Sequence, residues 1–320
     1  MQARLVNRLR LKHWALLAAL ADCTTLQQAA LQVGVSQPSA TKMLADLETA
    51  FQFTLFDRHP RGLRATALGA EVLAYAQRAQ AGLAHFMEDL ELKRHGGHGL
   101  LVVGAILGAG PDVVARAVAA IKRERPLLSI RLLGETSEQI GRALERRDIE
   151  LAVGRFTTQQ QYRFLDFTAL SNEVVQLVVR RGHGLMRKRN PTLAELTGCP
   201  WIMQPQSNPT RQLLQAEFDQ AGLAGPADVV ECGSVFAMLQ LLQTSDAVAA
   251  LPESVVRDHV RAGLLRVLPV PLGAELRGFG ILTRKGETLS EVARVFVGLL
   301  HAFANAAPRP GGALRATRSR

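Results

Sequence analysis

The sequence predicts a mixed fold class: an N-terminal winged helix-turn-helix, a long linker helix and a C-terminal two-lobed α/β domain like periplasmic solute-binding proteins. Three observations support this prediction. Residues 26–47 have the periodicity of two short helices around a glycine turn, residues 68–94 continue as one apolar stripe, and strand and helix patterns alternate from Leu100 onward. The predicted segments are the first domain 1–67, the linker helix 68–94, a hinge 95–99, the α/β domain 100–305 and a tail 306–320.

The two short helices are joined at a glycine. The first of them carries its apolar residues at spacings of three and four, namely Leu26, Ala29, Ala30 and Val33. Gly34 permits the positive φ of a sharp turn, Ser36 suits a helix N-cap, and Pro38 sits early in the helix, where a missing N–H costs nothing. The second helix therefore starts near Gln37, with an inward stripe of Ala40, Met43, Leu44 and Leu47.

The outward face of the second helix is short and polar. Side chains of this kind, at the N-terminal end of a helix that fits the major groove, can reach base edges and phosphates. The candidate DNA-binding residues around this helix are Ser36, Gln37, Pro38, Ser39, Thr41 and Lys42. The alternative is an ordinary helical hairpin with a solvated face.

The flanking residues complete a small domain. Upstream, the apolar pattern in residues 9–20 predicts a helix that closes a three-helix core. Downstream, residues 51–66 place β-formers on both sides of a turn containing Pro60 and Gly62, which predicts a small hairpin, or wing. The arginines on or beside this wing are candidates for phosphate or minor-groove contact: Arg58, Arg61 and Arg64.

Residues 9–69 resemble the winged helix-turn-helix of LysR-type transcriptional regulators. The resemblance is carried, in order and spacing, by Ser36-Gln37-Pro38, Thr41-Lys42, Leu55-Phe56-Asp57-Arg58 and the run from Gly62 to Gly69. Within that family, the Thr41-Lys42 pair and the wing are most similar to the galactose-binding-protein regulator branch. A looser resemblance covers residues 100–305, including 183–185 and 207–211. It implies a DNA-binding regulator of transcription with an inducer site in the second domain.

Length and charge agree with a DNA-binding protein of two domains. The 320 residues, 48% of them hydrophobic, are enough for a second domain with its own core. The formal net charge of +10 favours a polyanionic partner such as double-stranded DNA. We expect the acid-free tail to be disordered and solvated, the alternative being a second DNA-binding arm. Its positive charges are Arg309, Arg315, Arg318 and Arg320.

Cysteine usage and hydropathy predict a cytoplasmic protein. The 3 cysteines are odd in number and form no C-x-x-C motif, which favours a reducing compartment; a redox pair of Cys199 and Cys232 is the alternative. The apolar run Trp14–Ala21 is too short for a signal peptide or a membrane span, so we expect no membrane association. His95 and His98 lack a neighbouring cluster of Cys or carboxylate residues, so we expect no metal site there.

The linker helix carries a heptad-like apolar stripe. Its members recur at spacings of three and four: Leu68, Val72, Tyr75, Ala79, Leu83, Phe86 and Leu90. At a rise of about 1.5 Å per residue, a helix continuing to Lys93 is about 39 Å long, too long for the small wing domain to cover. A second copy of the same helix would cover the stripe, which predicts a homo-oligomer, either a dimer or a tetramer. Packing of the helix on its own C-terminal domain is the alternative.

From Leu100 onward the pattern is that of an α/β domain. The first predicted elements are a strand at 101–107, a helix at 112–125, a strand at 129–134, a helix at 138–147 and a strand at 151–154. Two strands follow within 164–180, then helices at 192–196, 211–221 and 234–244 among short strands at 201–204, 228–231 and 247–251, a strand at 276–284 and a helix from 290 to 305. This alternation predicts two lobes with a ligand crevice between them.

A glycine pattern raises the alternative of a nucleotide-dependent oxidoreductase. Gly104, Gly108 and Gly110 follow a predicted strand and open a helix, as in short-chain dehydrogenases. Those enzymes need a Tyr-x-x-x-Lys pair, but neither Tyr75 nor Tyr162 has Lys four residues later. P-loop, G-x-S-x-G and H-E-x-x-H motifs are absent from the sequence as well. We therefore expect a binding domain without enzymatic activity and without a cofactor.

The candidate ligand groups of the second domain lie at helix N-termini facing the crevice. Free amides there favour anionic or polyhydroxyl ligands, so the expected small-molecule effector is an organic acid or sugar-like. The candidate residues are Gly108, Ala109, Gly110, Thr136, Ser137, Gln204, Ser207, Asn208, Thr210 and Ser234. Thr136-x-x-Gln139 also fits a capping box, which alone would explain Thr136. The sequence thus predicts an effector-controlled regulator; the alternative is a DNA-binding protein whose second domain serves only oligomerisation.

Overall fold

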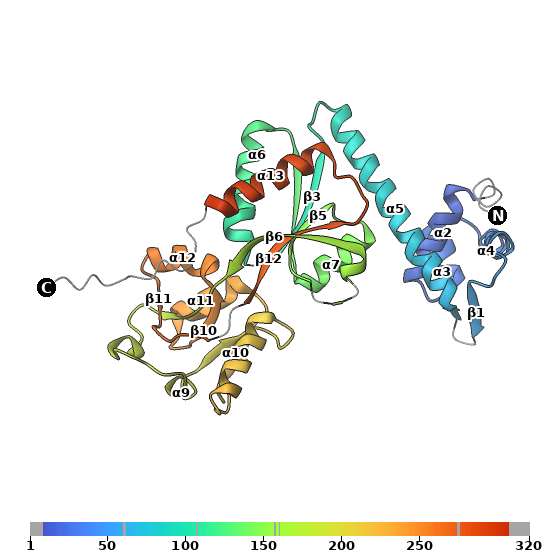
Figure 1. The fold of residues 1–320 in the computed structure, drawn as a ribbon. Helices are drawn as coiled ribbons and strands as arrows, with labels where there is room; N and C mark the ends of the chain where they lie inside the picture. Colours follow the sequence, from blue (N-terminus) through green and yellow to red (C-terminus); the bar gives the residue numbers. More distant parts are fainter. Residues whose placement is uncertain are drawn as a thin grey trace. The chain divides into compact units, whose positions relative to one another are not determined.

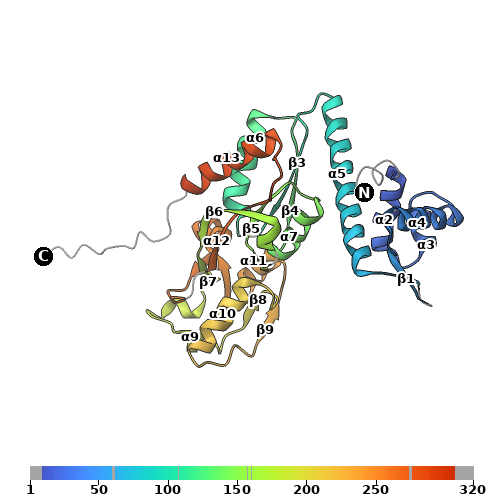
Figure 2. The same cartoon turned by 45° about the vertical axis from the view of Figure 1, so that its right-hand side comes forward.

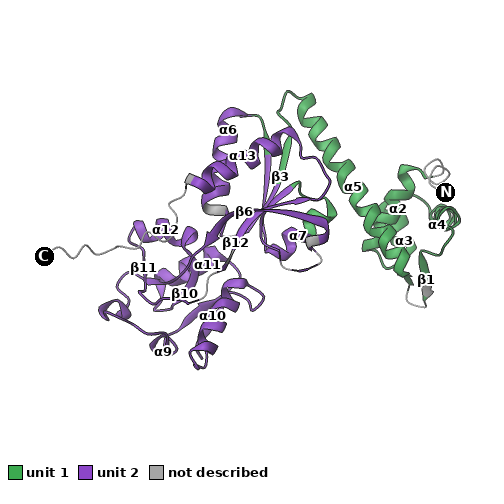
Figure 3. Ribbon diagram, viewed as in Figure 1, with its two compact units in different colours: residues 1–102, 127–129, 142–150 green, residues 103–126, 130–141, 151–320 purple. Residues whose placement is uncertain are grey.

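The computed structural model describes residues 9–59, 62–106, 108–156, 158–159, 161–273 and 276–306 of the 320-residue chain. The chain forms two compact units (Figure 3). The first consists of Met1–Val102, Leu127–Ser129 and Arg142–Glu150, and the second of Val103–Pro126, Ile130–Gly141 and Leu151–Arg320. The predicted mixed fold class, a winged helix-turn-helix followed by a two-lobed α/β domain, is confirmed.

The first unit begins with the winged helix-turn-helix, drawn in blue in Figure 1. Its elements are the helices α2 (Leu11–Asp22), α3 (Leu26–Gln32) and α4 (Gln37–Phe51) and the strands β1 (Phe56–His59) and β2 (Gly62–Ala65) (Figures 1 and 2). Small and aliphatic side chains fill the core between them, among them Leu16, Leu17, Ala29, Ala40, Leu47 and Leu55. The apolar stripes of the three helices therefore face one common core.

The turn between α3 and α4 follows the predicted chemistry. Gly34 has a φ of +67°, a conformation that residues with a side chain rarely adopt. The Ser36 hydroxyl accepts a hydrogen bond from Ser39 N at 3.4 Å, and Pro38 occupies the first turn of the helix. Helix α4 accordingly starts at Gln37, as predicted.

The wing is an antiparallel hairpin of β1 and β2 that is tied to the helices. Leu63 N donates a hydrogen bond to Thr24 O in the loop between α2 and α3, at 3.2 Å. A Cβ atom added at Gly62 would lie 2.3 Å from the same oxygen, so the close approach requires glycine. The predicted turn residues Pro60 and Arg61 lie outside the described residues.

A single helix of 28 residues, α5 (Ala67–Arg94), follows the wing. The Thr66 hydroxyl caps it by accepting from Gly69 N at 2.9 Å. The first half packs on the helix-turn-helix through the buried Leu73 and Ala76. In the second half the large apolar side chains are exposed: Leu83 (43%), Phe86 (59%), Met87 (54%) and Leu90 (47%).

The glycine-rich segment after α5 turns the chain toward the α/β domain. Gly97 N donates to Leu92 O at 2.9 Å, which closes the helix, and His98 N donates to Leu127 O at 3.1 Å. The segment predicted as a hinge is therefore a hydrogen-bonded turn in this structure.

The first lobe of the α/β domain contains a five-stranded sheet with the order β4-β3-β5-β12-β6. The strands are β3 (Leu100–Ala105), β4 (Ser129–Gly134), β5 (Leu151–Gly154), β6 (Leu165–Glu173) and β12 (Leu276–Arg284). Strands β3 and β5 are parallel, whereas β12 is antiparallel to both β5 and β6. The helices of this lobe are α6 (Ala115–Glu124), α7 (Ser137–Arg146) and α13 (Glu291–Ala306). Helices α6 and α13 lie side by side (Figures 1 and 2), with the Arg116 guanidinium 4.6 Å from the centre of the Phe303 ring.

The second lobe is formed by the chain between β6 and β12. One sheet has the order β10-β7-β11, and two further strands, β8 and β9, pair in parallel. The bounds are β7 (Val175–Arg180), β8 (Trp201–Met203), β9 (Val229–Glu231), β10 (Ala249–Pro252) and β11 (Leu265–Val267). The helices are η2 (Gly184–Arg187), α9 (Leu193–Leu196), α10 (Pro209–Gln220), α11 (Val235–Thr244) and α12 (Glu253–Arg261). The buried rings of Trp201 and Phe218 meet edge-on, 5.6 Å apart, and mark its core.

The structure corrects the sequence prediction in two respects. The helix expected at 112–125 begins as a five-residue π-helix, η1 (Gly110–Val114), and continues as α6. Four elements are absent from the prediction: α8 (Gln161–Phe164), η2, α12 and β11. Segments of three or four residues carry too little periodicity to be identified reliably, whereas the nine-residue α12 was missed although its valines recur at helical spacing.

Substitutions at two glycines of α5 test the packing of this helix on the winged helix-turn-helix. A Cβ atom at Gly69 would lie 2.0 Å from Leu55 O, whereas one at Gly82 meets nothing within 4 Å. We expect Gly69→Ala to lower the free energy of unfolding by about 1–3 kcal/mol through overpacking. Gly82→Ala should raise it by about 0.5–1 kcal/mol through helix propensity. Chemical denaturation of both variants measures the changes, and wild-type stability of Gly69→Ala would contradict the close approach.

Candidate functional site

The outward face of α4 is the first candidate site. Gln37, Ser39, Thr41 and Lys42 are exposed, while the opposite face lies in the core. The Ser36 and Ser39 hydroxyls are hydrogen-bonded at 2.8 Å, and Thr41 Oγ1 donates to Gln37 O at 3.0 Å. The side chains of Gln37 and Lys42 make no hydrogen bond to any other residue that the structure describes. They are therefore free to bind an external partner.

The wing also carries an exposed positive charge. Arg64 lies in β2 with an exposed side chain and is paired through the backbone with Asp57 of β1. Arg58 lies in β1 opposite Leu63. The third predicted wing arginine, Arg61, lies outside the described residues. An exposed arginine on a wing suits contact with a phosphate group.

The second candidate site lies where the lobes of the α/β domain meet, at the segment after β3. The carbonyl of Gly108 accepts a hydrogen bond from Ser254 Oγ at 2.7 Å. A Cβ atom at Gly108 would lie 1.4 Å from Glu173 Oε1, so the carboxylate fills the space beside this glycine. Ala109 is fully buried, and Gly110 begins η1. A negatively charged side chain therefore adjoins the amides predicted to attract an anion.

The Glu173 carboxylate forms an ion pair with the Arg155 guanidinium. Only 6% of the Glu173 side chain and 11% of the Arg155 side chain are exposed. Arg155 directly follows β5 and Glu173 ends β6, so the pair joins two strand ends where the chain leaves the first lobe. Loss of one partner would leave a buried charge uncompensated, which is strongly destabilising. Sequence reasoning missed this pair because its partners lie 18 residues apart and match no motif.

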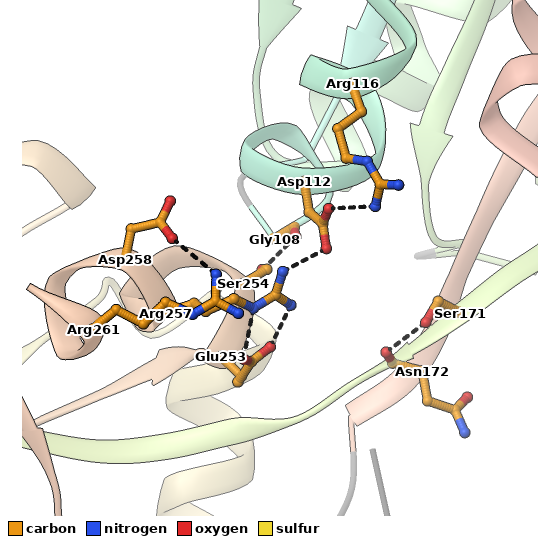
Figure 4. Close-up of polar contacts among 10 residues, drawn as sticks. All are labelled: Gly108, Asp112, Arg116, Ser171, Asn172, Glu253, Ser254, Arg257, Asp258 and Arg261. Carbon is orange, nitrogen blue, oxygen red and sulfur yellow. Dashed lines mark hydrogen bonds and ion pairs between the residues drawn. The ribbon is translucent and has the colours of Figure 1, made fainter. Parts of the chain in front are cut away.

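A cluster of charged side chains adjoins Gly108 (Figure 4). Arg257 Nη1 lies 2.8 Å from Asp112 Oδ2, and its Nη2 lies 2.6 Å from Glu253 Oε2. Arg116 lies 3.4 Å from the other carboxylate oxygen of Asp112. Burial raises the pKa of Asp112, but hydrogen bonds and charges from Arg257 and Arg116 outweigh it and hold the pKa below its ordinary 3.8. The pKa of Arg257 is raised by its hydrogen bonds to Glu253 and Asp112.

Thr136 and Ser137, which follow β4, lie at the start of α7. Thr136 donates to Gln139 Oε1 from its hydroxyl at 2.8 Å and from its backbone N at 3.1 Å. Gln139 N donates in return to Thr136 Oγ1 at 3.3 Å. The predicted capping box is thus confirmed. Ser137 is buried, and its hydroxyl lies near Gly154 at the end of β5.

Four of the five candidates in the second lobe are held by hydrogen bonds within that lobe. Gln204 is buried and donates from Nε2 to a backbone carbonyl of β10 at 3.0 Å. Asn208 caps α10 by accepting from the backbone N of the buried Thr210 at 2.9 Å. Ser234 caps α11, and Ser207 is exposed. Helix capping and ligand binding therefore compete as explanations for these side chains.

Metal, thiol and membrane features add little to these two sites. The described residues contain no cluster of three or more His, Cys, Asp or Glu side chains that could hold a metal ion. All three cysteines are free thiols, and burial raises the pKa of Cys199, which disfavours the reactive thiolate. Of the helices that the structure describes, none is long and apolar enough to cross a bilayer.

The lowered pKa of Asp112 predicts how its contribution to stability depends on pH. Because the folded-state pKa lies below 3.8, ionised Asp112 stabilises the fold above that pH, and the contribution is lost as the pH falls through the folded-state value. Asp112→Asn should lower the melting temperature at about pH 7, and its difference from wild type should shrink toward about pH 3. Asp258→Asn, which removes an 88% exposed carboxylate, is the control in calorimetric scans. Equal melting temperatures of wild type and Asp112→Asn at neutral pH would contradict the prediction.

Comparison with known proteins assigns both parts of the chain to families. The model of the bacterial regulatory helix-turn-helix protein, lysR family, matches residues 11–70. The model of the LysR substrate binding domain matches residues 94–305. The two models match in the order of the chain and cover, respectively, the helix-turn-helix with its wing and the two-lobed domain.

Individual relatives span nearly the whole chain. The HTH-type transcriptional regulator GbpR of Azospirillum brasilense is 29% identical over 296 residues, covering 92% of this chain and 86% of that protein. The structure of ArgP from Mycobacterium tuberculosis shares the fold, with a TM-score of 0.66, 14% identity and coverage of 93% and 98%. Full-length CbnR, solved in complex with its target DNA, has a TM-score of 0.62, 18% identity and coverage of 92% and 99%. Because the substrate-binding model alone matches more than half of the chain, the protein belongs to the LysR family of DNA-binding transcriptional regulators, which combine a helix-turn-helix with an effector-binding domain.

Proposed function

We propose that this LysR-family chain binds a specific operator and that a small polar effector, bound between the lobes of its second domain, controls it. The observation that supports this most directly is the segment from Gly108 to Asp112. It follows a strand of the first lobe and contacts α12 of the second. A ligand bound there would touch both lobes, and a ligand that prefers one lobe arrangement shifts the population toward it.

The DNA-binding surface is the exposed N-terminal half of α4 together with the wing. Gln37 offers an amide that can pair with a base edge, and Lys42 and Arg64 offer cations for phosphates. CbnR, whose fold this chain shares, has been solved with its target DNA, which supports the same role for this head. Such a regulator acts where its DNA lies, so we place the protein in the cytoplasm.

Two threonines of α4 form a matched pair for testing this surface. Thr41 and Thr49 are both exposed, and each hydroxyl donates to the carbonyl four residues earlier, at 3.0 Å and 2.8 Å. Thr41 lies in the N-terminal half of the helix and Thr49 near its C-terminal end. Thr41→Ala and Gln37→Ala should each weaken binding to the specific operator by about 1–3 kcal/mol. Thr49→Ala should bind as wild type does in gel-shift titrations.

Lys42→Ala distinguishes backbone contact from base contact. Removing a cation that contacts a phosphate should weaken binding to specific and unrelated DNA alike, and lower the slope of log affinity against log salt by about 1. Titrations at several salt concentrations measure both quantities. Wild-type affinity and salt slope in the Lys42, Thr41 and Gln37 variants together would refute the assigned surface.

We infer that a second copy of the chain covers the apolar face of α5. Leu83→Asp would bury a charge in that seam, which is unfavourable. Ala84→Asp adds the same charge one residue later, on the exposed side away from the stripe. Sedimentation should show a smaller species for Leu83→Asp only, with weaker binding to a two-half-site operator than to a half-site. An unchanged mass for Leu83→Asp would place the oligomer contact elsewhere.

The effector is expected to be a small organic acid or a sugar-like molecule, bound without chemical turnover. A thermal-shift screen of such compounds on the full chain tests this, since a ligand at 100 times its dissociation constant stabilises the fold by about 2.7 kcal/mol. Ser207→Ala should reduce that gain and leave the ligand-free melting temperature unchanged. Thr136→Ala should also lower the ligand-free value, because its hydroxyl caps α7. If no compound shifts the melting temperature, the second domain serves oligomerisation alone.

A further inference from the structure

Two polar contacts connect α12 of the second lobe with the segment from Gly108 to Asp112 of the first lobe (Figure 4). Arg257 Nη1 lies 2.8 Å from Asp112 Oδ2, and Ser254 Oγ donates to Gly108 O at 2.7 Å. Ser254 and Arg257 are three residues apart and so lie on the same side of the helix. One turn of α12 therefore contacts both ends of the segment from Gly108 to Asp112.

Within α12, Glu253 holds the Arg257 guanidinium in the orientation in which it contacts Asp112. Arg257 Nε donates a hydrogen bond to Glu253 Oε1 at 2.8 Å, and its Nη2 donates to Glu253 Oε2 at 2.6 Å, one turn earlier in α12. On the far side Asp112 is flanked by Arg116 of its own lobe at 3.4 Å. The result is an alternating row of four charges, Glu253–Arg257–Asp112–Arg116, that runs from one lobe into the other. Only 27% of the Arg257 side chain and 13% of the Asp112 side chain are exposed, so salt screens the central pair less than a surface pair.

Asp112, the partner of Arg257 in the first lobe, lies in an irregular helical segment. Asp112 lies in η1, a single turn of π-helix ahead of α6. Such turns are rare and frequently occur at functional sites. Conversion of this turn to an α-helical one would change the position of Asp112 relative to α6, and with it the contact to Arg257. A change in the backbone at Gly108 to Gly110 can therefore act on this contact.

The connection between the lobes permits such a movement. The chain passes from the first lobe to the second after Glu173 and returns before Leu276. Each lobe has its own sheet, so the lobes can separate without loss of a strand pairing.

We propose that Arg257 with Asp112, and Ser254 with Gly108, form a latch that holds the two lobes in the arrangement seen here. The latch is released when the segment from Gly108 to Asp112 is rearranged. The lobe arrangement is a property of the chain itself, whereas the release by an effector rests on the function proposed above.

Distances between spin labels on the full chain test the latch without any ligand. One label is placed at Ala119 of α6 and the other at Gln240 of α11, both exposed, in a background where the native cysteines are replaced by serine. Labelled protein is diluted with unlabelled protein so that only distances within one chain are measured. The variants are Arg257→Gln, Asp112→Asn and Ser254→Ala, each compared with Arg261→Gln. Arg261 is the matched control, because it is 73% exposed and pairs at 3.6 Å with Asp258 of its own helix.

We expect one narrow distance distribution for wild type and for Arg261→Gln. Asp112→Asn and Arg257→Gln should each add or shift to a second distance, and Arg257→Lys should restore part of the wild-type distribution. Ser254→Ala should have the same effect to a smaller extent, because it removes an uncharged contact. Wild-type distributions in both Asp112→Asn, which preserves side-chain shape, and Arg257→Gln would overturn the latch.

Operator binding of the same variants separates the latch from the regulatory function. Altered distances with an altered operator footprint support both proposals. Altered distances with an unchanged footprint support the latch and contradict the transmission of lobe movement to the DNA-binding head.

Discussion

The α/β domain depends on the buried ion pair of Glu173 with Arg155. It links the end of β6 to the residue after β5, and its carboxylate occupies the space that a side chain at position 108 would need. The ends of β5 and β6 and the segment after β3 therefore meet at this pair. Because an isolated charge is costly in a low dielectric, neither partner can leave without the other or a replacement. The pair thus sets the position of the segment that leads from β3 into η1.

Polar contacts connect this region of the first lobe with the second lobe. The second lobe buries an apolar cluster of its own around Trp201 and Phe218, and the sheets of the two lobes share no strand. Contacts that are partly open to water contribute far less than a packed core, so the arrangement of the lobes can respond to a ligand. In a regulator of this family, that response is what the effector-binding domain has to supply.

The DNA-binding head follows the opposite principle. Its backbone segments approach each other so closely that no Cβ atom fits at Gly62 or Gly69. The free backbone N–H groups at the starts of α4 and α5 donate to capping hydroxyls. Close packing of this kind holds the wing and α4 as one body. In the DNA-binding mode proposed above, a rigid head would keep the spacing between α4 and the wing constant.

The sequence alone determined the features that depend on neighbouring residues. The glycine turn at Gly34, the start of α4 at Gln37, the capping box at Thr136 and the limits of β12 all follow from local spacing and capping chemistry, and all are present in the structure. The apolar stripe of α5 was equally evident from its spacing. What covers that stripe depends on surfaces beyond the helix, so spacing alone could not decide it.

Only the tertiary structure decided which charged groups meet. Arg155 and Glu173 are 18 residues apart, and Asp112 and Arg257 are 145 apart, so no periodicity or motif connects them. The helix N-termini chosen from the sequence were reasonable anion sites in isolation, because free amides attract negative charge. The fold places the Glu173 carboxylate beside Gly108 and occupies the hydroxyls of Thr136 and Ser234 with caps. Local sequence specifies which groups a helix end offers, whereas the packing of distant strands decides which of them are already used.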